Sequence, residues 1–185
     1  MSGHSKWSQI KRQKGVSDAA KSRVFSKFAR EIALESKKAA GNMSSPSLAA
    51  VIARAKAANM PKDNIERAVT KGTSKDSGDL EAVVYECYGP GGVAIIATAV
   101  TDNRNRTTQE IKHLLSSNDY ALGAVGSAAW AFTKSPDGRY AANEPKMSVS
   151  AEDETKLGEL LNLLDEHDDV QEVFTNAEGY ENTSE

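Results

Sequence analysis

The first fifteen residues concentrate side chains that could hold a nucleic acid. Four cations, one tryptophan and one histidine fall within eleven positions: His4, Lys6, Trp7, Lys11, Arg12 and Lys14. Cations neutralise backbone phosphates, and an aromatic ring can stack on an exposed base. We therefore assign these six residues to nucleic-acid binding. Trp7 has a second interpretation, as a hydrophobic anchor that holds this segment against the rest of the protein.

A second group of cations lies along a predicted helix that begins near residue 18. Arg23, Lys27 and Arg30 follow one another at spacings of four and three residues, which places them on one face of a helix. These three residues form a cationic stripe, which Lys37 extends, and Lys21 lies on the same helix. We assign Lys21, Arg23, Lys27 and Arg30 to phosphate contacts.

The third candidate is the segment 102–106, Asp-Asn-Arg-Asn-Arg, which precedes another predicted helix. Backbone N–H groups at a helix N-terminus attract anions, so Arg104 and Arg106 are well placed to contact a phosphate. The alternative is that both arginines offset local acids such as Asp102 and Glu110.

The net charge of −3 conceals a separation of charge along the chain. Residues 1–75 contain 16 Lys and Arg against 5 Asp and Glu, whereas residues 76–185 contain 7 against 21, so the two parts carry +11 and −14. Such asymmetry indicates a polyanionic partner for the basic part. The alternative is two solvated surfaces that attract each other.

Three helical patterns must position the basic side chains. Ser17 or Asp18 can cap the first helix, Ser45-Pro46 opens the second, and Pro61 opens the third, which we expect Gly72 to end. Each pattern has apolar residues at helical spacing on one side. Arg67 and Lys71 lie one turn apart on the outer side of the third helix. The N-terminal part is therefore predicted to be a three-helix bundle.

After a polar linker the apolar period changes from helical to extended. We expect an α+β protein whose second part is a small α/β domain, with a mostly antiparallel four-stranded sheet and two helices on one face. Gly and Pro at 89–92 predict a hairpin, and Thr107-x-x-Glu110 predicts a capping box. The expected elements are strands at 82–88, 93–100, 127–133 and 170–174, a weak strand at 147–149, and helices from 107 and over 152–166.

The chain shows no constellation of catalytic residues. His4, His113 and His167 are isolated in sequence, and Asp168-Asp169 falls in a predicted turn, where we expect solvated acids. Cys87 is the single cysteine, so an internal disulfide and a cysteine-based zinc cluster are both excluded. We expect a cytoplasmic protein that is not an enzyme, with no cofactor, no bound metal, no small-molecule substrate and no membrane partner.

Five motifs, spread in order over nearly the whole chain, resemble the YebC/PmpR family. They are Gly-His-Ser-Lys-Trp at 3–7, Asn-Met-Pro-Lys-Asp-Asn-Ile-Glu-Arg-Ala at 59–68, Tyr-Gly-Pro-Gly-Gly at 88–92, Thr-Asp-Asn-Arg-Asn-Arg-Thr at 101–107 and Asp-Asp-Val-Gln at 168–171. The resemblance implies an N-terminal helical bundle followed by α/β domains. It also implies a regulator of transcription that binds DNA, or a relative of the mitochondrial translational activator of cytochrome oxidase and of bacterial factors that relieve ribosome stalling.

The chain departs from this family pattern in length. Members near 240 residues carry a further α/β domain, which we expect to be deleted around 135–149. The expected organisation is a basic arm and helical bundle at 1–78, an α/β domain at 79–176, and a disordered acidic tail at 177–185. Two arginines of a family segment are also replaced at Ser47 and Ala49, which predicts a weaker or differently placed grip.

Three functions remain open from the sequence. The first is binding to structured RNA on the ribosome, because cations without a visible base-reading helix suit recognition of shape and phosphate. The second is DNA-binding regulation of transcription, which requires groove-facing side chains at a helix start. The third is a protein-interaction adaptor that uses the acidic domain. We expect a monomer or weak dimer.

Overall fold

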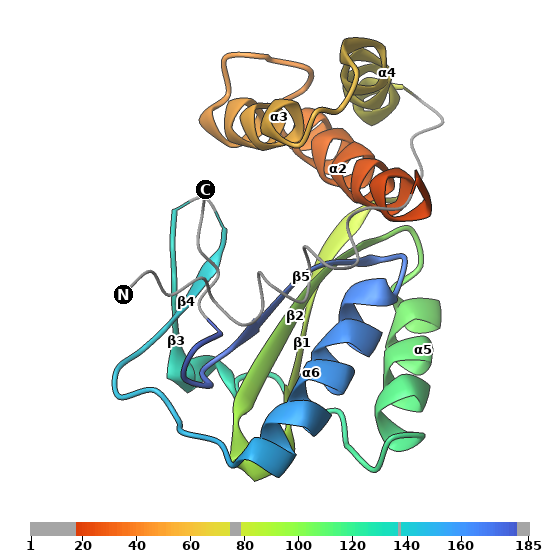
Figure 1. Cartoon of the computed structure of the whole chain (residues 1–185). Coiled ribbons are helices and arrows are strands. Elements are labelled where there is room, and N and C mark those ends of the chain that lie inside the picture. The colour runs from red at the N-terminus through yellow and green to blue at the C-terminus, as the bar shows by residue number, and fades with distance from the viewer. Residues whose placement is uncertain (1–17, 75–78, 137, 181–185) are drawn as a thin grey trace.

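The computed structural model describes residues 18–74, 79–136 and 138–180. The basic arm, with His4, Lys6, Trp7, Lys11, Arg12 and Lys14, lies outside the described residues. The predicted α+β class is confirmed: a group of helices is followed by antiparallel strands and two further helices (Figure 1). None of the helices in the described ranges is long and apolar enough to cross a bilayer.

The three predicted N-terminal helices are present. They are α2 (Asp18–Lys38), α3 (Pro46–Ala57), which carries Pro46 in its first turn, and α4 (Lys62–Thr73). Their inward faces form one apolar core that contains Ile32, Leu48, Ile52 and Ile65. The periodicity therefore identified the buried side of each helix.

Gly72 has a different role from the predicted one. It lies inside α4 and does not end the helix. A Cβ atom at this position would stand 2.3 Å from the carbonyl oxygen of Ala33 and 2.8 Å from Cβ of Ser36. Beside this contact, Ser36 Oγ donates a hydrogen bond to the carbonyl oxygen of Val69 at 2.8 Å. The missing side chain allows α4 to pack directly on the backbone of α2.

The main sheet contains three antiparallel strands in the order β1-β2-β5. These are β1 (Glu81–Tyr88), β2 (Ala94–Thr101) and β5 (Val170–Thr175), with the predicted hairpin turn closed by a 3-10 turn at Pro90–Gly92. Helices α5 (Arg104–Ser116) and α6 (Ala151–Glu166) cover one face (Figure 1). Ile111, Leu157 and Ile95 are fully buried in the core between these layers.

The remaining strands do not join this sheet, contrary to the expected four-stranded arrangement. A 3-10 turn occupies Ala129–Ala131, and the strand begins only afterwards, as β3 (Phe132–Lys134), which pairs with β4 (Tyr140–Ala142) in a separate hairpin. The hairpin packs on the face of the sheet opposite α6, where the ring of Tyr140 lies 5.6 Å from that of Phe174. Side-chain packing, and not strand pairing, attaches it to the sheet.

The last described residues are also more ordered than predicted. The peptide N–H of Met147 donates to the carbonyl of Asn176 at 2.9 Å, so the weak strand predicted at 147–149 is reduced to a single bridge with Ala177. Ala177 and Tyr180 are buried. The expected acidic tail therefore cannot begin at 177, and residues 181–185 lie outside the described part.

A buried carboxylate holds the segment before β3 on the sheet. Glu86, on β1, is only 5% exposed. Its Oε1 accepts from the N–H of Gly126 at 2.7 Å, while Oε2 accepts from the N–H groups of Ala128 and Ala129 at 2.7 and 2.8 Å. Three N–H donors converge on one carboxylate, so Glu86 holds this segment as a loop at the position where a regular strand was predicted.

Replacing Glu86 by glutamine is expected to lower the free energy of unfolding by about 2 kcal/mol, because one acceptor oxygen becomes an NH2 donor that faces a backbone N–H. Urea denaturation of the purified protein measures the change. The matched change at the exposed Glu159 on α6 should alter stability by less than about 0.5 kcal/mol. Equal effects at both positions would contradict a structural role for the Glu86 carboxylate.

Candidate nucleic-acid interface

The cationic stripe of α2 faces the C-terminal end of α6. Lys27 Nζ lies 3.1 Å from Oδ1 of Asp165 and also donates to the Asp165 backbone carbonyl, while Arg23 is 3.9 Å from Glu166. The last turn of α6 contains no basic residue of its own. Because the C-terminal end of a helix carries partial negative charge, cations from α2 complement both the dipole and the acids. Arg23 and Lys27 therefore have internal anionic partners.

Asp169 joins the two parts of the protein at the end of this stripe. Its Oδ1 lies 2.7 Å from Arg30 of α2, and its Oδ2 lies 2.8 Å from Arg106 of α5. Thr107 Oγ1 donates to the same Oδ2 at 2.6 Å. The Asp169 side chain is 5% exposed, so the expectation of a solvated acid is wrong. Its position just before a buried strand was the sequence signal for burial.

The environment of Asp169 favours its charged form. Burial by itself would raise the pKa of this carboxyl, but hydrogen bonds from Thr107 and Arg106 and the charge of Arg30 lower it below the ordinary value. One buried carboxylate thus remains ionised between two guanidinium groups that belong to different parts of the fold.

The anion site expected before α5 is occupied by the protein itself. Asn103 caps α5 and accepts from the N–H of Arg106, so the helix begins earlier than the predicted capping box at Thr107. Arg106 lies 3.1 Å from Asp102 and 3.9 Å from Glu110, and Arg104 lies 3.8 Å from Glu81. The ion pairs of Arg106 with Asp102 and Glu110 agree with the alternative that this arginine offsets local acids, whereas the acid near Arg104 is Glu81.

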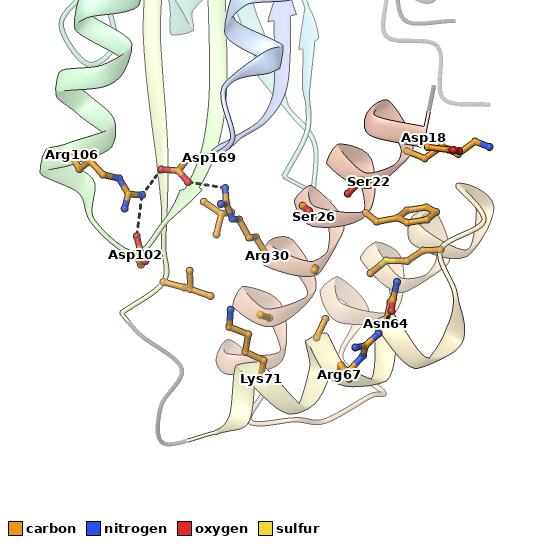
Figure 2. Close-up of a pocket in the computed structure, with 18 residues that line it drawn as sticks. Asp18, Ser22, Ser26, Arg30, Asn64, Arg67, Lys71, Asp102, Arg106 and Asp169 are labelled. Atoms are coloured by element: carbon orange, nitrogen blue, oxygen red, sulfur yellow. Dashed lines mark hydrogen bonds and ion pairs between the residues drawn. The ribbon is translucent and has the colours of Figure 1, made fainter. Parts of the chain in front are cut away.

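A cleft of about 870 Å³ opens between α2, α4 and the α/β domain. Figure 2 shows Arg30, Arg106 and Asp169 on one side of it, with Arg67 and Lys71 of α4 on the other. Phe25 and Met60 contribute apolar surface to the lining. The lining contains five cations and three carboxylates, so the cleft has an excess of positive charge: Lys21, Arg30, Arg67, Lys71 and Arg106 against Asp18, Asp102 and Asp169.

The distribution of ion pairs makes this cleft distinctive. Among the cations of residues 18–74, four make no salt bridge with any carboxylate in the described part of the chain: Lys21, Lys56, Arg67 and Lys71. Three of these four line the cleft, and only Lys56 does not. The positive charge that the fold leaves uncompensated is therefore gathered at one place.

The structure brings together only some of the predicted binding residues. Lys21, Arg30 and Arg106 meet at the cleft, whereas Arg23 and Lys27 line a smaller cavity of about 240 Å³ on another side of α2. Arg67 and Lys71 were not assigned to a site from the sequence, although their spacing of one turn was visible. Their relation to α2 depends on the packing of α4, which a local pattern does not reveal.

Two other places in the described residues contain side chains of metal-binding or reactive type. Ligand atoms of Glu110, His167 and Asp169 lie within 4.8 Å of one another, but Arg106 is bonded to Asp169 and lies near Glu110, so a metal cation would have to displace a guanidinium. Burial raises the pKa of Cys87 to about 12, which keeps its thiol protonated and unreactive at neutral pH.

Comparison with known proteins agrees with this architecture. The chain matches the TACO1/YebC protein N-terminal domain over residues 5–75 and the TACO1/YebC second and third domain over residues 80–137. A protein of Syntrophobacter fumaroxidans is 43% identical, over 98% of this chain and 73% of the relative. The chain belongs to the TACO1/YebC family. It is shorter than these relatives.

Other members of the TACO1/YebC family support the same assignment. A protein of Petrotoga mobilis is 40% identical, over 96% of this chain and 71% of the relative. Both it and the Syntrophobacter protein are named probable transcriptional regulatory proteins. The crystal structure of a conserved hypothetical protein from Aquifex aeolicus matches with a TM-score of 0.76 and 30% identity, over 87% of this chain and 91% of that one.

Proposed function

We propose that this protein is a nucleic-acid-binding regulator of gene expression that acts through its basic N-terminal part. The names of its relatives support a regulatory role. The observation that carries the proposal is the charge that remains after folding. The basic part has a large excess of cations, and three of its four described cations without an acidic partner gather at the cleft. A polyanion is the partner that this arrangement would attract.

The geometry favours RNA over a groove-reading mode on DNA. A recognition helix must present its side chains to the major groove, with residues near its N-terminus on base edges. The cationic face of α2 is instead turned toward α6 and Asp169, where Lys27 and Arg30 are engaged. We therefore place binding to structured RNA on the ribosome first. DNA-binding regulation of transcription, which the names of the relatives favour, is the second candidate.

Sedimentation with ribosomes tests this order. We expect the tagged protein to comigrate with ribosomes from lysate at low salt and to be released at high salt, because phosphate contacts weaken steeply as counterions accumulate. Changing Lys6, Lys11 and Lys14 together to glutamate should abolish comigration. The control changes the same amount of charge in the acidic domain, at Lys112, Lys134 and Lys156, and should leave comigration intact.

Two outcomes would contradict the proposal in different ways. If the protein is absent from ribosomes but recovered with promoter DNA from the same lysate, the transcriptional role takes first place. If the protein is recovered with neither ribosomes nor promoter DNA, or if both triple variants behave like the wild type, the basic part is not a nucleic-acid-binding surface. An adaptor role for the acidic domain would then take precedence.

We also infer where the extra residues of the longer relatives are inserted. The match to the second and third domain ends at residue 137, a position that falls in the sequence between the bounds of β3 and β4. The turn is closed by a hydrogen bond from the N–H of Ser135 to the carbonyl of Arg139 at 2.8 Å. On this inference the short hairpin stands where the longer relatives carry a further domain, and the deletion expected around 135–149 remains a prediction.

A further inference from the structure

The cleft combines two kinds of surface that a nucleotide requires. Four of its five cations lie on α2 and α4, and Phe25 and Met60 add apolar surface beside them. A nucleotide presents a negatively charged phosphate and a flat base with apolar faces. A volume of about 870 Å³ falls within the range of pockets that enclose small ligands.

The apolar lining of the cleft favours one form of nucleic acid over another. In a duplex the bases are stacked and paired, so only the backbone could reach the rim of the cleft. In a single strand, an unstacked base can enter a pocket and stack on an aromatic side chain. Phe25 offers such a ring, because it is only partly buried by the helical core against which it packs.

The charges around the cleft indicate where the phosphates would lie. Arg67 and Lys71 are one turn apart on α4, and Lys21 is contributed by α2. Arg67 bonds to Asn64 and to the Asp63 carbonyl, so its guanidinium is held in position without being neutralised. Arg30 and Arg106 share the carboxylate of Asp169. The uncompensated side of the cleft is therefore the side formed by the helical domain.

We propose that this cleft binds one or two nucleotides of a single-stranded nucleic acid, with phosphates on Lys21, Arg67 and Lys71 and a base against Phe25. The proposal rests on the proposed function and adds the place of binding and the form of the ligand.

Fluorescence anisotropy with three probes tests the assignment: a labelled twelve-nucleotide RNA, a single-stranded DNA of the same sequence, and its DNA duplex. We expect the full-length protein to bind the two single strands more tightly than the duplex. The double change Arg67→Glu and Lys71→Glu should weaken single-strand binding by about 10- to 100-fold. Lys56 also has no described acidic partner but lies outside the cleft. Lys56→Glu should therefore weaken single-strand binding by less than about threefold.

A second variant tests the base contact separately from charge. Phe25→Leu keeps an apolar side chain in the helical core but removes the ring, and should weaken single-strand binding by about fivefold or more. Circular dichroism and thermal unfolding establish that each variant is folded. Tighter binding of the RNA probe than of the single-stranded DNA probe would identify the sugar as an additional determinant.

The results separate this inference from the proposed function. If the wild type binds none of the probes and no ribosomes, the proposed function itself fails. Suppose instead that the wild type binds but Lys56→Glu weakens binding as much as the cleft variants do. Or suppose that the duplex binds best and the cleft variants leave binding unchanged. In both cases the protein binds nucleic acid elsewhere. Either of the latter results would overturn the assignment of the cleft.

Discussion

Replacing Asp169 by alanine is expected to lower the free energy of unfolding by about 3 kcal/mol, because removal of one partner leaves the guanidinium groups of Arg30 and Arg106 uncompensated. The carboxylate is almost fully buried, whereas both arginines keep a solvated portion, so the cost should not exceed that of a fully buried pair. The same change should loosen the attachment of α2 to the α/β domain. Urea denaturation measures the stability, and hydrogen exchange on α2 measures the loosening.

Asp168 provides the matched control for Asp169. It is exposed, and the contact that it makes with Arg30 uses its backbone carbonyl, which alanine retains. Asp168→Ala should therefore change stability by less than about 0.5 kcal/mol. If the two alanine variants were equally stable, Asp169 would not be the residue that connects the two parts.

The pH dependence of this stabilisation has a definite sign. Since the folded-state pKa of Asp169 is below the ordinary value, the unfolded chain takes up the proton first as the pH falls. The contribution is complete at neutral pH and is lost as the pH falls below about 4, the ordinary aspartate range, toward the folded-state value. The stability difference between wild type and Asp169→Asn should be constant from pH 6 to 8 and should shrink in acid.

Gly72→Ala should lower the free energy of unfolding by more than about 3 kcal/mol, because the added methyl group has no room between α4 and α2. The new Cβ would stand 2.3 Å from the Ala33 carbonyl oxygen, and a backbone atom cannot move aside as the end of a flexible side chain can. Alanine is otherwise a better helix former than glycine, so intrinsic propensity alone predicts the opposite sign.

Thermal unfolding followed by circular dichroism distinguishes these two expectations. Thr70→Ala, on the exposed side of α4, serves as the control and should change stability by less than about 1 kcal/mol. A Gly72→Ala protein as stable as the wild type would show that α4 can shift on α2 at little cost. In that case the position of Arg67 and Lys71 in the cleft would be adjustable.

Local patterns predicted the elements of this fold better than their assembly. Ser45-Pro46 and Pro61 located the starts of α3 and α4, because capping and proline preferences act within one turn of helix. The hairpin at 89–92 was predicted for the same reason. Gly72 was misread because its role depends on Ala33, almost forty residues earlier in the chain.

The candidate site depended still more on long-range contacts. The spacing of Arg23, Lys27 and Arg30 correctly placed them on one face of α2, but spacing cannot reveal that acids from residues 165–169 cover this face. Asp169 looked like one of many solvated acids until the fold placed it between α2 and α5. The cleft is formed only when α2, α4 and the α/β domain come together.

The turn between β3 and β4 has a practical consequence for the design of reporters. The two strands of this separate hairpin pair from Phe132 with Ala142 to Lys134 with Tyr140, so the chain leaves β3 and enters β4 at adjacent points. Pro136 and Gly138 in this turn are exposed, and a guest protein whose own termini lie close together can be inserted into such a loop without separating the two strands. A circularly permuted fluorescent protein inserted between Ser135 and Arg139 would therefore sit at the tip of this hairpin, on the side of the main sheet opposite α6, where its fluorescence can serve as a reporter.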